Sequence, residues 1–307
     1  MKKEKYNIDK ELMPYTKIKT PLVPFIVVIF QKLMSVLYAF QKSDKYIKVS
    51  KKKVMIDNKK KIKVLIYENK NNTKQLPCMY FIHGGGFVFN SAPHHFKQVR
   101  KFVKELNIKA ILVNYRLAPK NKFPIPLLDC FNVYKWILSN KELNIDTNKI
   151  IIAGDSAGGN LSTSLCLMAN DLNIKAPLAQ MLFYPVLDKH MNTKSYKKYQ
   201  DTPLCNSKDM EKYFNMYVKD LKIDNHYLSP IDAKSFKNMP ITYIEVAEFD
   251  CLHDEGILYA NKLEKENVKV ELHEIKNSMH GYDIATSSSF MNKINNIRFN
   301  FIKNILK

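Results

Sequence analysis

Arginine is scarce in this sequence, although its net charge is strongly positive. Lysine and arginine together number 49 against 29 acidic residues, a formal net charge of +20, yet only Arg100, Arg116 and Arg298 are arginines. Nucleic-acid recognition favours the planar guanidinium fork, and no lysine run here is interleaved with aromatic residues on a recognisable binding module. We therefore expect a solvated lysine surface and no nucleic-acid partner, with weak attraction to anionic surfaces as a secondary effect.

Cysteine pairs and metal-binding spacings are also missing. The five cysteines, at positions 78, 130, 166, 205 and 251, are widely spaced and form no C-x-x-C pair. This pattern predicts neither a disulfide framework nor a zinc site. Free thiols fit a reducing compartment, so we expect a cytoplasmic protein without a bound metal.

No apolar stretch is long enough to cross a membrane. The best candidate, residues 21–40, is interrupted by Gln31 and Lys32, whereas a spanning helix needs roughly 20 apolar residues in a row. The stretch also starts too far from Met1 for an export signal. We expect a buried or interfacial amphipathic helix and no stable insertion in a membrane.

Short β-branched or apolar runs alternate with helical patterns from about residue 46 onward, which is typical of a mostly parallel sheet flanked by helices. The predicted strands cover residues 47–56, 62–67, 79–82, 110–113, 150–153, 179–183, 241–246 and 268–274. The first two form an antiparallel start through a turn at 58–61. Helices are predicted at 95–106, 126–139, 157–170, 254–266 and 287–305. The fold class is therefore α/β, with eight strands in one sheet.

Two stretches do not follow this alternation. Residues 1–45 precede the sheet, and residues 188–228 interrupt it with several aromatic side chains among lysines. Long interruptions of a compact domain are usually functional or carry structure of their own. We interpret residues 46–307 as the catalytic domain, and both stretches as parts of one helical cap. The apolar side of the 21–40 helix is expected to pack on the 188–228 insertion.

Glycine is rare, with eight residues in 307 against roughly 7 % in average proteins. Three of the eight surround Ser156 in Gly154-Asp155-Ser156-Ala157-Gly158-Gly159, between a predicted strand and a predicted helix. A Gly-x-Ser-x-Gly turn at that place is typical of a nucleophile elbow, which lifts the serine hydroxyl clear of the backbone. The alternative, a phosphate-binding turn, lacks both the G-x-x-x-x-G-K-[ST] and the G-x-G-x-x-G patterns.

A second glycine cluster, His83-Gly84-Gly85-Gly86, follows the strand predicted at 79–82. Consecutive glycines after a strand allow several amides to point at one place, which is how an oxyanion hole is built. The alternative is a flexible turn, which is less expected where glycine is so rare.

Hydrolases with this elbow keep the chain order serine, acid, histidine. His190 and His226 lie in the presumed cap, His253 starts a helix and His273 lies inside a strand, which leaves His280 as the candidate base. For the acid we prefer Asp250, in the loop after the strand at 241–246. Its rival is Asp254, which resembles a first-turn helix residue stabilised by the helix dipole.

These motifs resemble the hormone-sensitive-lipase family of α/β-hydrolases, which includes bacterial carboxylesterases and arylacetamide deacetylases. The matching segments are His83–Phe87, Tyr115–Pro119, Gly154–Asn160, Ser229-Pro230, Glu248–Asp250, Asp254–Gly256 and His280-Gly281. The resemblance implies a triad of Ser156, Asp250 and His280, oxyanion donors at the amides of Gly85, Gly86 and Ala157, and no cofactor. This chain departs from the family at Cys251, where a proline is usual, and at Asn90, where a glycine is usual.

The sequence thus predicts a serine carboxylesterase that hydrolyses small esters with short-to-medium acyl chains through an acyl-enzyme. An amidase or deacetylase with the same triad is the alternative enzyme. The alternative of another class is a ligand-binding protein on a hydrolase scaffold, since a fold alone does not prove a function. The sequence leaves the oligomeric state and the physiological ester open.

Overall fold

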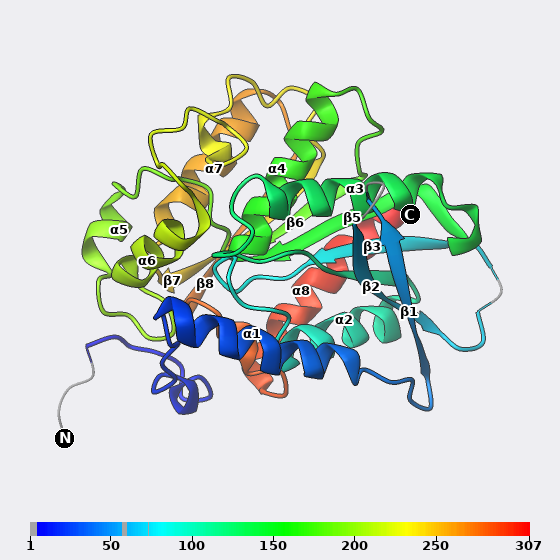
Figure 1. The fold of residues 1–307 in the computed structure, drawn as a ribbon, viewed down its shortest axis with the longest axis horizontal. Helices are drawn as coiled ribbons and strands as arrows, with labels where there is room; N and C mark the ends of the chain where they lie inside the picture. The colour runs from blue at the N-terminus through cyan, green and yellow to red at the C-terminus, as the bar shows by residue number, and fades with distance from the viewer. Residues whose placement is uncertain (1–4, 57–59, 73) are drawn as a thin grey trace.

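The computed structural model describes residues 5–56, 60–72 and 74–307, which form one sheet with helices on both faces (Figure 1). The strands of the described chain are β1 (Ile47–Met55), β2 (Lys61–Asn69), β3 (Leu76–Ile82), β4 (Lys109–Asn114), β5 (Ile145–Asp155), β6 (Ala179–Phe183), β7 (Ile241–Phe249) and β8 (Val270–Met279). Their order is β1-β2-β4-β3-β5-β6-β7-β8. β2 is antiparallel to both β1 and β4, and the remaining neighbours are parallel. The predicted eight-stranded, mostly parallel sheet is confirmed.

The predicted strand boundaries hold to within a few residues except at two ends. β5 begins at Ile145 and β8 continues to Met279, beyond the predicted 150 and 274. Residues 58 and 59 of the turn predicted at 58–61 lie outside the described residues. β1 and β2 pair on either side of it, with Met55 opposite Lys61.

The helices are α1 (Pro24–Ala39), α2 (Pro93–Leu106), α3 (Ile125–Ser139), α4 (Ala157–Asp171), α5 (Lys194–Lys198), α6 (Ser207–Tyr217), α7 (His253–Lys265) and α8 (Ser289–Leu306), with 3₁₀ turns at Met13–Tyr15, Lys141–Leu143, Pro230–Asp232 and Tyr282–Ile284. All five helices predicted for the catalytic region are therefore present. Residues 188–228 carry α5 and α6, and the N-terminal stretch carries α1.

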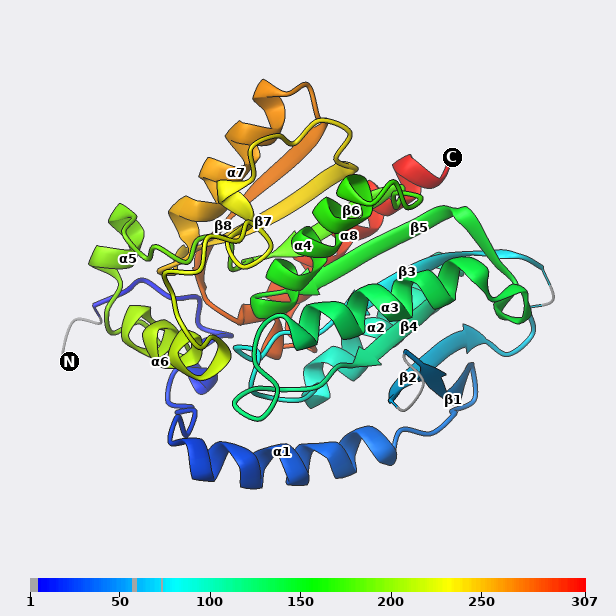
Figure 2. The ribbon, with the colours of Figure 1, turned by 45° about the horizontal axis from the view of Figure 1, so that its top comes forward.

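The core lies on both faces of the sheet, which explains why the central strands read as unbroken apolar runs. Along β3, Cys78 and Tyr80 belong to one buried cluster while Met79 and Phe81 belong to the other. The first cluster contains side chains of α3, α4 and α7, and the second contains side chains of α2 and α8. The parallel strands are thus fixed between two helical layers, and their carboxyl ends meet at one edge (Figure 2).

Helix α1 begins near this edge and runs along the outside of the molecule toward β1 and β2 (Figures 1 and 2). Its inner side is fixed by Gln31, whose amide donates to the carbonyls of Val88 at 2.8 Å and Ala118 at 2.6 Å. Tyr38 donates to the Leu112 carbonyl at 3.0 Å. The helix therefore rests on the loops after β3 and β4 and on β4 itself.

The expectation that the apolar side of α1 is buried against residues 188–228 is wrong for most of that side. Phe25 is 76 % exposed and Leu33 is 60 % exposed. The apolar residues of α1 occupy nearly every side of the helix, so their spacing does not indicate which side faces the protein. None of the described helices combines the length and the hydropathy that a bilayer crossing requires.

Candidate active site

Ser156 occupies a strained turn between β5, which ends at Asp155, and α4, which begins at Ala157. Its backbone has φ 51° and ψ −118°, a conformation that non-glycine residues rarely adopt and that costs about 1–3 kcal/mol. A Cβ at Gly158 would overlap the Ile82 carbonyl of β3. Glycine at this position therefore allows α4 to approach the sheet closely while Ser156 is held in the elbow.

The structure brings Ser156, His280 and Asp250 into one hydrogen-bonded chain. The Nε2 atom of His280 lies 2.9 Å from the Ser156 Oγ, and its Nδ1 atom lies 2.7 Å from a carboxylate oxygen of Asp250. Asp250 directly follows β7 and His280 directly follows β8. Since β7 and β8 are parallel neighbours, their carboxyl ends place the acid and the histidine side by side.

Both ends of this chain are fixed by further contacts. The second carboxylate oxygen of Asp250, which is fully buried, accepts the Leu252 amide at 3.0 Å. The His280 ring packs edge-on against Tyr184, with ring centroids 4.8 Å apart. These contacts leave the imidazole little freedom to rotate away from Ser156.

The surroundings of His280 favour its protonated form. Burial alone would lower its pKa, but the Asp250 carboxylate outweighs that effect and raises the pKa to about 9. An imidazole that is held as a strong base beside a hydroxyl can accept the hydroxyl proton. The geometry and charge therefore suit nucleophilic catalysis by Ser156.

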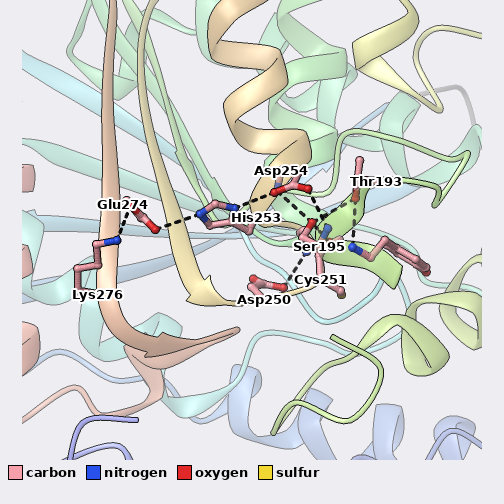
Figure 3. Close-up of polar contacts among 10 residues, drawn as sticks. Thr193, Ser195, Asp250, Cys251, His253, Asp254, Glu274 and Lys276 are labelled. Atoms are coloured by element: carbon pink, nitrogen blue, oxygen red, sulfur yellow. Dashed lines mark hydrogen bonds and ion pairs between the residues drawn. The ribbon is translucent and has the colours of Figure 1, made fainter. Parts of the chain in front are cut away.

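Asp254, the rival acid, makes different contacts (Figure 3). One of its carboxylate oxygens accepts the Ser195 amide at 2.8 Å, and the other lies 3.0 Å from His253 Nδ1. Ser195 in turn donates its hydroxyl to the Cys251 carbonyl at 2.8 Å. Asp254 thus connects α5 to the first turn of α7. Its contacts are those of a residue that holds two helices together.

The His83–Gly86 loop lies against the elbow. Gly85 and Gly86 have φ of +108° and +60°, the left-handed region that favours glycine. Within the described chain, no protein acceptor bonds to the amide of either residue. The amide of Ala157 opens α4 and is one of the first-turn amides that a helix leaves unpaired. All three amides are therefore free to bind an oxyanion.

Asp155 connects the glycine loop to the elbow that carries Ser156, and the sequence did not indicate this role. Its carboxylate accepts the Gly84 amide at 2.9 Å and lies 3.1 Å from His95 Nε2. His95 also accepts the Ala92 amide at 2.8 Å. The only available signal was the position of Asp155 inside the elbow motif, next to the serine.

His94, His95 and Asp155 are also the one group among the described residues whose ligand atoms lie close enough together to hold a metal ion. Burial lowers the pKa of both His94 and His95 to about 4, so both imidazoles are neutral. Asp155 and His95 already bond to each other and to backbone amides. These hydrogen bonds hold the glycine loop in place through Asp155 and His95.

A cavity of about 310 Å³ opens above Ser156 and His280. Its wall combines the glycine loop with apolar and aromatic residues from the two stretches outside the α/β pattern: Ile18, Pro21, Phe30, Met34, Leu204 and Tyr213. A second, larger depression of about 510 Å³ lies around Arg100 and Lys104, but charged and polar side chains make up most of its lining, and it shares no lining residue with the cavity at Ser156. The smaller cavity is the one that a nucleophile faces.

Comparison with known proteins agrees with this geometry. A sequence profile described as the alpha/beta hydrolase fold matches residues 79–284, more than half of the chain. A protein of Acanthamoeba polyphaga mimivirus, described as an alpha/beta hydrolase, is 33 % identical over 234 residues, covering 74 % of this chain and 67 % of that protein. A carboxylesterase of Mycobacterium tuberculosis is 29 % identical over 241 residues, covering 77 % of this chain and 76 % of the relative.

The fold comparison extends over nearly the whole chain. The solved structure of a bacterial heroin esterase superposes with a TM-score of 0.88 at 26 % identity, covering 98 % of each chain. The likeness therefore includes α1 and the 188–228 insertion as well as the sheet. The resemblance seen in the motifs is confirmed: this chain belongs to the α/β-hydrolase family, in its hormone-sensitive-lipase and carboxylesterase group.

Proposed function

We propose that this chain is a serine carboxylesterase that hydrolyses small esters with short-to-medium acyl chains through an acyl-enzyme on Ser156. The observation that carries the proposal is the continuous chain from Ser156 through His280 to buried Asp250 at the base of an apolar cavity. Relatives of similar length carry esterase names, which supports ester hydrolysis as the class of reaction.

In the first half-reaction His280 Nε2 accepts the Ser156 hydroxyl proton while the serine oxygen bonds to the ester carbonyl carbon. The carbonyl π electrons move onto oxygen and form a tetrahedral oxyanion. When this intermediate collapses, the bond to the alkoxy oxygen breaks and the leaving oxygen takes the proton from His280. An alcohol leaves, and the acyl group stays on Ser156.

In the second half-reaction water replaces the alcohol. His280 accepts a proton from water, whose oxygen attacks the acyl carbon. Collapse then breaks the bond to Ser156, which takes the proton back and releases a carboxylic acid. Asp250 stays ionised throughout, fixes the imidazole tautomer and stabilises the imidazolium.

The amides of Gly85, Gly86 and Ala157 are the proposed oxyanion donors. Two of them belong to a loop whose backbone is held by Asp155, and the third lies at the N-terminus of α4, where the helix dipole favours negative charge. Loss of one preorganised donor of this kind typically reduces kcat by about 10²–10³-fold.

We assign residues 1–45 and 188–228 to the cap, as the sequence suggested, and residues 46–307 with this insertion to the catalytic domain. The support is the cavity wall, to which Met34 and Tyr213 contribute from the two stretches. A largely apolar wall reduces the access of water to the reacting carbonyl and holds an acyl chain. The small volume is the reason to propose short-to-medium acyl chains.

The proposed reaction uses only side chains and water, so no cofactor is included in the mechanism. The partner we propose is a small uncharged ester, and the lysine-rich surface is not assigned to a nucleic acid. We place the protein in the cytoplasm because all five cysteines are buried free thiols, which suits a reducing compartment.

Hydrolysis of p-nitrophenyl esters of increasing acyl length, with fluorophosphonate labelling and peptide mapping, tests the proposal. Ser156→Ala is expected to abolish turnover and labelling. Ser162→Ala is the matched control, because this serine lies in α4 shortly after Ser156, is buried, and has a hydroxyl without a partner in the described chain. Labelling at another serine would overturn the assignment.

The same assay separates the alternatives. Faster hydrolysis of a matched p-nitroanilide than of the ester would favour the amidase. Saturable binding of esters without turnover in the unmodified protein would favour a ligand-binding protein.

A further inference from the structure

Helix α1 exposes a continuous apolar stripe to solvent. Of the 17 large hydrophobic side chains that are exposed among the described residues, nine lie between positions 23 and 40. They are Val23, Phe25, Ile26, Ile29, Phe30, Leu33, Val36, Leu37 and Phe40. Contiguous exposed apolar surface of this kind marks an interaction site.

The stripe follows the helical repeat and lies away from the protein. Ile26, Ile29, Leu33 and Phe40 are spaced at three, four and seven residues, so they share one side of the helix. Val27, Gln31 and Tyr38 form the opposite, inner side. Val27 is buried, and Gln31 and Tyr38 donate hydrogen bonds to backbone carbonyls of the catalytic region. The contact of α1 with its own chain therefore leaves the outer stripe uncovered.

The charge around the stripe is positive. Between Glu11 and Asp44 the sequence has no acidic residue, and the lysines of that segment are Lys17, Lys19, Lys32 and Lys42. All four are exposed. They lie before, within and after the helix, and the whole chain carries a formal charge of +20.

We propose that the outer face of α1 docks reversibly on a lipid surface that carries anionic headgroups. An apolar helical stripe accompanied by lysines is what such a surface binds, because the acyl boundary takes up the apolar side chains while the headgroups attract the ammonium groups. The helix is too short and too polar in its middle to span the bilayer, so the docking is parallel to the surface.

A second copy of this chain suits the face less well. A two-fold interface places the same patch of each subunit against itself, which would bring the lysines around α1 of one copy near the lysines of the other. The repulsion between like charges opposes that contact, whereas an anionic surface is complementary to it.

The docking face is continuous with the mouth of the cavity. Phe30 is 40 % exposed and Ile18 is 41 % exposed, and both also line the cavity above Ser156. A docked molecule would thus hold its pocket entrance at the lipid boundary. This consequence for substrate entry rests on the proposed function, whereas the docking itself does not.

Flotation of the full-length protein with vesicles tests the docking. Phosphatidylcholine vesicles that contain phosphatidylglycerol should carry the protein with them and release much of it at high sodium chloride, and vesicles of phosphatidylcholine alone should carry far less. The triple variant Phe25→Gln, Leu33→Gln, Phe40→Gln should lower the partition coefficient by about a hundredfold or more. Lys17→Gln, Lys32→Gln and Lys42→Gln should each lower it by roughly fivefold.

The matched control replaces three exposed leucines elsewhere, Leu172, Leu258 and Leu272, by Gln. It should float like the unmodified protein. Both triple variants should hydrolyse a short water-miscible ester at the unmodified rate, since none of the six residues lines the cavity. Ser156→Ala should also float normally, so that failure of the proposed function and failure of docking are distinguished.

Two results would overturn the docking proposal. One is the absence of flotation with anionic vesicles, or flotation that the α1 triple variant leaves unchanged. The other is sedimentation of the unmodified protein as a dimer that the α1 triple variant dissociates, without vesicle binding, which would assign the face to a second copy.

Discussion

The bond from His280 to Asp250, at 2.7 Å, is the shorter of the two that connect the acid to Ser156. We expect Asp250→Asn to lower kcat by about 10⁴-fold, as replacement of the aspartate does in a serine-protease triad, because the amide favours the wrong imidazole tautomer. Ester hydrolysis under saturating substrate measures the effect.

Asp254→Asn is the matched control, because it changes the neighbouring carboxylate that bonds to Ser195 and His253. Its kcat should fall far less than that of the Asp250 variant. A larger loss in the Asp254 variant would transfer the acid role to that residue.

The raised pKa of His280 predicts a specific pH dependence. A general base must be unprotonated, so with a pKa of about 9 rather than the usual 6.5 the free enzyme gains activity as pH rises and loses it as pH falls. The acid limb of kcat/KM reports this group. It should lie clearly above 6.5 for an uncharged ester, and it should move down in the Asp250→Asn variant. An acid limb at or below 6.5 in the unmodified enzyme would contradict the prediction.

At the level of single residues, the sequence predicted positions best where a motif fixes the backbone. The glycines around Ser156 and the order of serine, acid and histidine were enough to predict which side chains meet. The support by Asp155 and His95 was not predictable, because it depends on a contact between the end of β5 and the start of α2, between residues that are 60 positions apart in the sequence. The direction of the α1 stripe was also missed, since burial depends on neighbours that helical spacing does not identify.

At the level of elements, a buried ion pair fixes α8 to the sheet beside the histidine loop. Arg298 donates from Nε to Glu245 Oε1 at 2.8 Å and from a terminal nitrogen to Oε2 at 2.6 Å, and both side chains are fully buried. The Tyr282 hydroxyl, two residues after His280, donates to the same carboxylate. Glu245 of β7 thus connects the sheet, α8 and the segment that carries His280.

Glu245→Gln should therefore destabilise the fold strongly. Removing one partner leaves a buried, uncompensated charge, which typically costs about 3–5 kcal/mol. The urea midpoint of unfolding, followed by circular dichroism, measures the loss. Glu274→Gln, which breaks the exposed pair with Lys276, is the control and should change the midpoint much less. Equal shifts in the two variants would show that the buried pair adds no special stability.

The elements themselves were largely predictable because the sheet is buried on both faces. Unbroken apolar strands between helical patterns left few alternatives, and β6 was predicted at its observed bounds. The start of β5 and the end of β8 were not, because the residues at these two ends are partly polar. In β8, the continuation to Met279 depends on pairing with Phe249 of β7 rather than on any local preference.

For the whole molecule, the sheet explains how distant segments form one site. Ser156 follows β5, Asp250 follows β7 and His280 follows β8, and these strands lie within one half of the sheet and run in parallel. Groups at the carboxyl ends of parallel strands face the same crevice. The helices that we propose as a cap then need only cover that edge, which is why changes in them are expected to alter substrate choice more than the fold.

All five cysteines are buried, so the reaction of each thiol with a reagent reports when the structure around it opens. Cys78, Cys130 and Cys166 lie in β3, α3 and α4, where burial raises the pKa of Cys78 to about 12, and Cys251 is fully enclosed beside Asp250. Cys205 is different, because it lines the cavity from the cap side. Timed alkylation with iodoacetamide, read by mass spectrometry, should modify Cys205 first, at the rate at which the cap opens. The other four should follow only at the rate of global unfolding. Uniform modification of all five would show instead that cap and sheet open together as one cooperative unit.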